Sequence, residues 1–86
     1  MGTPRQKVDR LPEKLLQIRV ALGLSQSEMH SRLGVDDIPY NRISDYERGK
    51  REPPLKVILR YARVAHVSME ALVDDDMDLP KKFPKR

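Results

Sequence analysis

The chain has 86 residues and a formal net charge of +4, with 38% hydrophobic and 35% charged residues, which suffices for one domain with a single core. It contains no cysteine, which excludes disulfides and thiolate zinc sites, and no apolar run of about 18 residues, which excludes a membrane span. Because residues 1–7 also lack the apolar segment of a secretory signal, we expect a cytoplasmic protein.

The first predicted helix begins near Leu11 and ends at Gly23, a residue suited to cap a helix C-terminus. Pro12 falls in the first turn, where its missing N–H does no harm. The inward face consists of apolar residues at helical spacing, namely Leu15, Ile18 and Leu22.

The second predicted helix begins at Ser25, because Ser25 and Glu28 match a capping box, in which each side chain accepts a hydrogen bond from the other residue's N–H. Met29 and Leu33, four residues apart, form its buried face. Gly34 ends it, since glycine readily adopts the positive φ of a helix terminus.

Residues 35–40 form a turn, because an acidic pair and a proline oppose a continued helix there. The third predicted helix spans residues 39–48, with Ile43 and Tyr46 facing inward and Gly49 as its stop. Its other faces are polar, so one side of this helix is expected to reach solvent.

A basic loop over residues 50–54 leads to a fourth helix with the apolar stripe Leu55, Ile58, Leu59, Ala62 and Ala65. Ser68 caps a short fifth helix that carries Met69, Leu72 and Val73. We therefore predict an all-α domain of five helices over residues 11–73. A flexible arm is expected over residues 1–10, and a disordered charged tail over residues 74–86.

Charge is unevenly distributed along the chain. Residues 1–80 carry 13 basic and 13 acidic side chains, so the excess of +4 lies in residues 81–86. Residues 42–63 hold seven basic and three acidic side chains, and acidity collects over residues 74–78. A basic patch opposed by an acidic end favours an oriented approach to a polyanion, although a solvated helix face would give the same counts.

The order and spacing of five stretches of the chain match the pattern of a known family. They are residues 22–26 (LGLSQ), 33–35 (LGV), 43–53 (ISDYERGKREP), 61–62 (YA) and 67–72 (VSMEAL). In these, the chain resembles the XRE-type family of phage Cro and lambda-repressor-like DNA-binding domains over about residues 11–73. The resemblance implies a five-helix, lambda-repressor-like fold and a bacterial or phage-type protein associated with the nucleoid. Its third helix would enter the major groove of DNA.

The resemblance implies a role for each matching residue. The base-reading candidates lie at the exposed start of the third helix: Tyr40, Asn41, Arg42, Ser44 and Asp45. The phosphate-binding candidates are Gln26, Arg48, Lys50 and Arg51, although Gln26 could also be an ordinary polar helix residue. Arg19 and Glu47 would form a structural ion pair between the first and third helices.

The chain departs from the family pattern in its turn. Glu47 lies thirteen positions after Gly34, which makes the turn longer than in the family, and His30 replaces a residue that is usually alanine. A longer turn leaves room for the imidazole, and a metal or catalytic role for His30 is not expected. Asp36 and Asp37 would either lie near phosphates or cap the third helix.

The resulting hypothesis is a sequence-specific regulator that binds double-stranded DNA, acts as a repressor and forms a homodimer. The fifth helix would supply dimer contacts, unless its apolar residues belong to the core. The alternative is a protein-interaction module, such as an antitoxin or accessory factor, that binds its partner through the C-terminal segment. We expect no enzyme activity, cofactor, metal or membrane contact, because no catalytic or ligand constellation is present.

Overall fold

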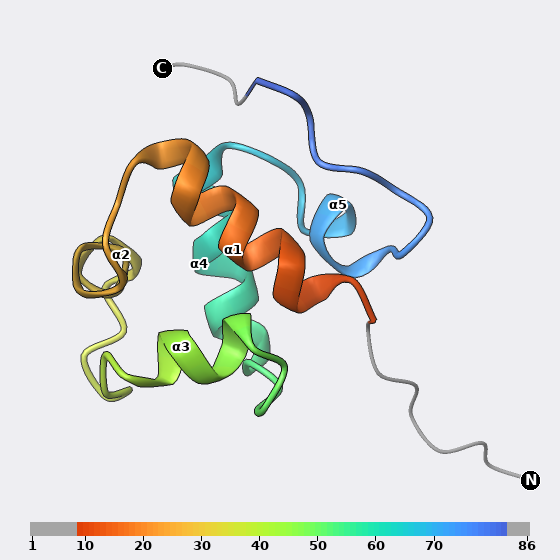
Figure 1. Ribbon diagram of the computed structural model, residues 1–86. Helices are drawn as coiled ribbons and strands as arrows, with labels where there is room; N and C mark the ends of the chain where they lie inside the picture. Colours follow the sequence, from red (N-terminus) through yellow and green to blue (C-terminus); the bar gives the residue numbers. More distant parts are fainter. Residues whose placement is uncertain (1–8, 83–86) are drawn as a thin grey trace, which may run out of the picture.

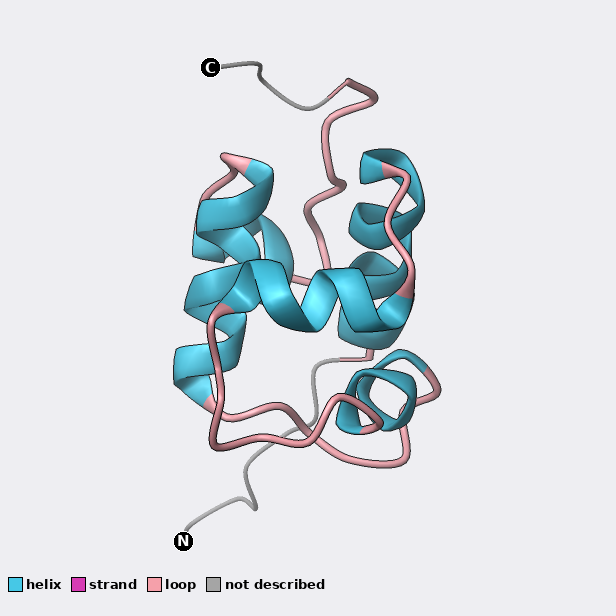
Figure 2. Cartoon of the chain, turned by 90° about the vertical axis from the view of Figure 1, so that its left-hand side faces the viewer, coloured by secondary structure: helices cyan, strands magenta, loops and turns pink. Residues whose placement is uncertain are grey.

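The computed structural model describes residues 9–82, which form five α-helices and, within this range, no strand (Figures 1 and 2). The helices are α1 (Leu11–Leu22), α2 (Gln26–Leu33), α3 (Arg42–Glu47), α4 (Leu55–Ala65) and α5 (Met69–Val73). α1 packs against α3, α4 and α5, while α2 packs against α3 and α4. The predicted all-α class is confirmed. None of the helices described is long and apolar enough to span a bilayer.

Local capping signals set most helix ends. Ser25 and Glu28 form the predicted capping box, with the Ser25 Oγ accepting from the Glu28 N–H at 3.1 Å and the Glu28 carboxylate accepting from the Ser25 N–H at 2.8 Å. Gly23 and Gly34 end α1 and α2 with φ of 71° and 67°, in the left-handed region that glycine enters without steric cost. Ser68 caps α5 as predicted.

One apolar core lies between the helices. Its fully buried members come from all five, and include Leu15, Ile18, Met29, Leu33, Ile43, Val57, Tyr61 and Leu72. The predicted stripe of α4 was wrong at Leu55, which is 73% exposed, and it omitted Val57 and Tyr61. Leu55 is the first residue of α4, where the helix begins after a mostly exposed loop.

The third helix is shorter than the predicted span of residues 39–48. Residues 39–41 form a turn instead, in which the Arg42 N–H donates to the Pro39 carbonyl at 3.0 Å and the Ile43 N–H donates to the Tyr40 carbonyl at 3.1 Å. The elongated turn before it is anchored by Val35 and Ile38, which are both buried. These two apolar residues explain how a long turn stays ordered.

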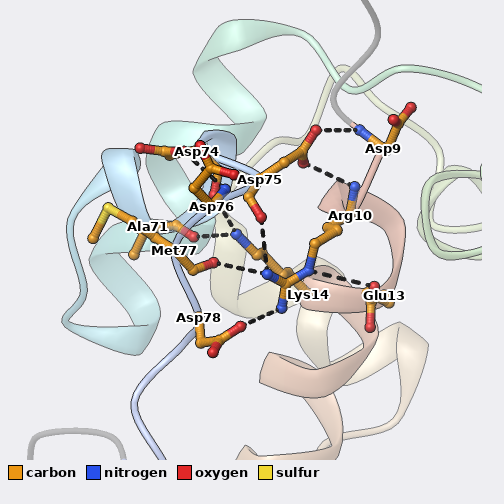
Figure 3. A network of polar contacts seen from close by, with 10 residues as sticks. All are labelled: Asp9, Arg10, Glu13, Lys14, Ala71, Asp74, Asp75, Asp76, Met77 and Asp78. Carbon is orange, nitrogen blue, oxygen red and sulfur yellow. Dashed lines mark hydrogen bonds and ion pairs between the residues drawn. The ribbon is translucent and has the colours of Figure 1, made fainter.

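The segment after α5 is attached to the start of α1 (Figure 3). Both Asp75 carboxylate oxygens accept from backbone N–H groups, of Asp9 and Arg10, at 3.0 Å. The Arg10 guanidinium in turn donates to the Asp78 carboxylate at 2.6 Å and to the carbonyls of Asp75 and Met77 at 2.9 and 3.3 Å. Asp75 thus supplies the N-terminal cap that α1 lacks in its own sequence.

Lys14 completes this connection from inside the fold. Its side chain is fully buried, and its Nζ donates to the carbonyls of Ala71 at 2.7 Å and Asp74 at 2.9 Å, which lie at the end of α5. We call Arg10, Lys14, Asp75 and Asp78 together the α1–α5 clasp.

The clasp corrects the expectation of disorder after α5. Within the segment after α5, Leu79 is buried and the half-buried Met77 packs against the core. Composition pointed to disorder because charge dominates there, but two of the carboxylates are fixed by Arg10 and by backbone N–H groups. Residues 9 and 10 likewise belong to the fold and not to an arm. The remainder of the predicted arm and tail, residues 1–8 and 83–86, lies outside the described residues.

Candidate nucleic-acid interface

The structure brings Arg19 and Glu47 together, as the resemblance implied. Arg19 Nε lies 2.7 Å from Glu47 Oε2, and Arg19 Nη2 lies 3.2 Å from Glu47 Oε1. The two side chains are 18% and 4% exposed, and Arg19 also donates to the Leu24 carbonyl at 2.9 Å. The hydrogen bond to Glu47 raises the pKa of Arg19. A bidentate ion pair of this kind fixes the end of α3 against α1.

Gln26 joins the same pair. Its Nε2 donates to Glu47 Oε1 at 3.2 Å, and the side chain is half-buried. This contact places the first residue of α2 beside the last residue of α3. The side chain that the resemblance assigned to a phosphate is therefore held at the end of α3 by Glu47.

The base-reading candidates straddle the start of α3. Tyr40, which is 58% exposed, and Asn41 precede the helix, whereas Arg42, Ser44 and Asp45 lie within it and are half-buried. The five lie within residues 40–45, interrupted by the buried Ile43, so they cover the turn before α3 and its first four residues. The exposed aromatic ring and amide are the most accessible of the set.

Asp45 is enclosed by basic groups. Its Oδ2 lies 3.7 Å from Arg42 Nη1 and 3.4 Å from Arg51 Nε. The pairs offset the negative charge of Asp45, which would otherwise oppose an approaching phosphate. Asp45 therefore orients two arginines, a relation that the sequence signalled only through the i, i+3 spacing of Arg42 and Asp45.

The loop after α3 presents Arg48, Lys50 and Arg51, which are all exposed. Its backbone folds back on α3: the N–H groups of Lys50 and Arg51 both donate to the Asp45 carbonyl, at 2.9 and 3.4 Å. Gly49 makes this reversal with φ of 74°, a conformation that side chains rarely tolerate. Three predicted phosphate-binding side chains thus share one ordered loop.

The acidic pair of the elongated turn does not cap α3. Asn41 occupies the N-cap position without a side-chain hydrogen bond, so the capping interpretation of Asp36 and Asp37 was wrong. Asp37 instead pairs with Lys56 of α4 at 2.6 Å, and this hydrogen bond lowers the pKa of Asp37. Lys56 offsets the negative charge of Asp37, and Asp36 remains exposed.

His30 contacts the same turn. Its Nε2 forms a hydrogen bond with the Ile38 carbonyl, and the ring is half-buried. The imidazole thus occupies the room that the elongated turn provides. Among residues 9–82 no cluster of histidine and carboxylate side chains could hold a metal ion.

This geometry agrees with a family match. A family model described as helix-turn-helix matches residues 15–72 of the chain. The chain belongs to the XRE-type helix-turn-helix family. Its five helices have the lambda-repressor-like arrangement, with α2 and α3 as the helix-turn-helix pair. No curated protein and no solved structure matched the chain.

Membership of this family indicates a general function. The XRE-type helix-turn-helix family is a family of DNA-binding transcription regulators and not of enzymes. In the helix-turn-helix geometry, the second helix of the pair enters the major groove and the first crosses the backbone. The pair in this chain is α2 and α3, and the exposed Tyr40 and Asn41 lie in the turn just before α3.

Proposed function

We propose that the protein is a sequence-specific regulator that binds double-stranded DNA, acts as a repressor and places residues 39–48 in the major groove. One observation carries the proposal: α3, which has the exposed Tyr40 and Asn41 just before its start, is fixed at its other end by Arg19, Glu47 and Gln26. Recognition of base edges requires side chains on a rigid support of this kind, because little conformational entropy is then lost on binding. Occupation of a site by such a protein excludes others from it, which is the simplest form of repression.

The proposed division of roles follows from chemistry and exposure. Arg42 pairs with guanine through two N–H donors, and Asn41 pairs with adenine. Tyr40 reaches a phosphate or a thymine methyl group, and Ser44 lies one turn further along. Asp45 accepts from a cytosine amino group or, as its ion pairs favour, holds Arg42 in position.

Affinity comes from the phosphate contacts. Arg48, Lys50 and Arg51 of the ordered loop bind the backbone on one side of the groove, and Gln26 at the start of α2 binds it on the other. These contacts set the position of the protein on the duplex without selecting its sequence.

A homodimer on a palindromic site would double the contacts of one small domain. Leu72 is fully buried and belongs to the core, so it takes no part in a dimer surface. Val73, which is 37% exposed, and the half-buried Met69 are the remaining candidates on α5. The mass in solution at low concentration, measured by light scattering, tests this part of the proposal.

Selection of bound duplexes from random DNA, followed by binding titrations of variants on the selected site, tests the main proposal. Arg42→Ala should weaken the selected site by about 1–3 kcal/mol and relax the preference at one base pair. Lys50→Ala should weaken all duplexes alike and make the dependence on salt less steep, with a slope reduced by about 1. Unchanged binding by both variants would refute the proposal.

The alternative of a protein-interaction module makes the opposite prediction, namely weak DNA binding that varies little with sequence. It relied on the acidic segment as the surface for a partner. Within the fold, however, Asp75 and Asp78 are already engaged by Arg10 and the start of α1. Binding titrations on the selected duplex and on a random duplex, at the same salt concentration, distinguish the two functions.

A further inference from the structure

A pocket of about 320 Å³ opens between α2 and α4. Six residues line it: Arg32, Leu33, Arg60, Arg63, Val64 and His66. Leu33 is fully buried and Val64 half-buried, so the inner wall is apolar, whereas the arginine and histidine side chains reach solvent. None of these four polar residues was a candidate in the sequence, because Arg32 of α2 meets Arg60, Arg63 and His66 of α4 and its C-cap only in the fold.

The side chains that line this pocket carry an excess of positive charge. None of the carboxylates in residues 9–82 lines it, and its three arginines form no ion pair with another residue of that range. Glu28 lies one turn before Arg32 and interacts with its charge, but the Glu28 carboxylate does not line the pocket and is held by the Ser25 N–H. Three guanidinium groups around one hollow repel one another, and an anion would relieve that repulsion.

A second observation concerns the backbone at His66. This residue ends α4 with φ of 58°, the one non-glycine residue with positive φ among those described. The corresponding ends of α1 and α2 carry Gly23 and Gly34, which adopt this conformation freely. A glycine would avoid this backbone strain, so the presence of histidine suggests that its side chain has a function. The imidazole of His66 lines the pocket.

We propose that this pocket binds a small molecule that carries a phosphate or diphosphate group. Guanidinium groups bind phosphate oxygens through paired N–H donors, and an imidazole adds a further donor. Three arginines match a group with two or more negative charges better than a single carboxylate. The pocket lies at the lower end of the range of about 300–1,000 Å³ typical of ligand sites, which suits a compact molecule.

The site also lies beside the helix-turn-helix. Arg60 Nη1 is 4.0 Å from the position that a Cβ atom on Gly34 would occupy, and Gly34 is where α2 ends and the elongated turn begins. A bound phosphate group would therefore sit next to the segment that leads to α3.

Titration of the ¹⁵N-labelled full chain with inorganic pyrophosphate at constant ionic strength tests the proposal. Saturable shifts should appear at the pocket arginines and at His66, with an affinity at least tenfold higher than for succinate. Arg60→Gln/Arg63→Gln should lower the pyrophosphate affinity at least tenfold. The matched control Lys81→Gln/Lys82→Gln removes the same charge from exposed residues outside the pocket and should change it less than twofold.

His66→Gly separates binding from folding. Glycine relieves the strained φ, so the melting temperature should stay equal or rise while pyrophosphate binds several-fold more weakly. An unchanged pyrophosphate affinity in this variant would remove His66 from the site.

Three results would overturn the phosphate pocket: no saturable shift, an equal loss in the control variant, or tighter binding of a penta-glutamate peptide than of pyrophosphate. A fourth would assign the arginines to DNA, namely a weaker duplex affinity of Arg60→Gln/Arg63→Gln with a salt slope reduced by about 2. Arg42→Ala should leave pyrophosphate binding intact, so failure of the pocket and failure of the DNA proposal give different results.

Discussion

Along α1, Arg10, Lys14 and Arg19 each meet acceptors within the fold, whereas Arg48 and Lys50 in the loop after α3 form no ion pair with any residue between 9 and 82. The first group lies at helix termini and buried contacts, where an unpaired charge would be costly. The second group lies on an ordered loop open to solvent. Position in the fold, and not residue type, therefore separates structural cations from those available to a ligand.

The largest expected effect is at Glu47, which holds both Arg19 and Gln26. Glu47→Ala leaves the half-buried guanidinium without its acceptor and should lower the free energy of unfolding by about 3–5 kcal/mol, measured by urea denaturation. Glu47→Gln keeps the size and one acceptor oxygen and should lose less. A loss below about 1 kcal/mol in Glu47→Ala would show that the pair contributes little to the scaffold.

Lys14 should rank second. Lys14→Met keeps the buried volume but leaves the Ala71 carbonyl without its Lys14 donor, whereas the Asp74 carbonyl still accepts from the Met77 N–H. We therefore expect a loss of about 1–3 kcal/mol in the free energy of unfolding. Gln17→Ala, at an exposed position of the same helix, is the matched control and should stay within about 0.5 kcal/mol of the parent. Equal stability of the two variants would contradict the role of the clasp.

A pH dependence should arise at Asp75. The N–H groups of Arg10 and Asp9 lower the pKa of this carboxylate in the folded state. Its contribution to stability is therefore complete above the unfolded pKa of about 3.9 and is lost as the pH falls through the lower folded pKa. Thermal melts between pH 2 and 6 should show a smaller acid-induced loss in Asp75→Asn than in the parent. Asp76→Asn, at an exposed neighbour, should melt like the parent across that range.

The smallest effect on folding is expected in the loop. Arg48→Ala/Lys50→Ala should change the free energy of unfolding by less than about 0.5 kcal/mol, because neither side chain supports the fold. The affinity of this double variant for DNA should nevertheless fall. A loss of stability in this variant, measured by urea denaturation, would show that the loop cations support the fold as those of α1 do.

Much of the fold could be predicted because its signals are local. Gly23, Gly34, Ser25 and Ser68 act within one helical turn, and the structure has them at the predicted helix ends. The start of α3 could not be placed, since Val35 and Ile38 order the turn through tertiary packing. Hydrophobic periodicity in the sequence cannot predict the position of a residue when that position depends on a distant partner.

The candidate site divides in the same way. The resemblance supplied Arg19 and Glu47, which share no local signal, and it indicated the segment around Tyr40. Lys14 lies on the inward stripe of α1 beside Leu15, yet a lysine there reads as solvent-facing until the carbonyls at the end of α5 are known. The partners of Asp37 and Asp45 likewise depend on how α4 and the loop are placed.

The cap of α1 has a consequence for synthesis. Its first turn depends on Asp75, which is 65 residues beyond Arg10 in the chain. While the protein is being made, α1 leaves the ribosome early, but its N-terminal N–H groups keep water as their partner until nearly the whole domain has emerged. The beginning of the domain is thus the last part to be completed, and premature termination before residue 75 leaves the first helix uncapped.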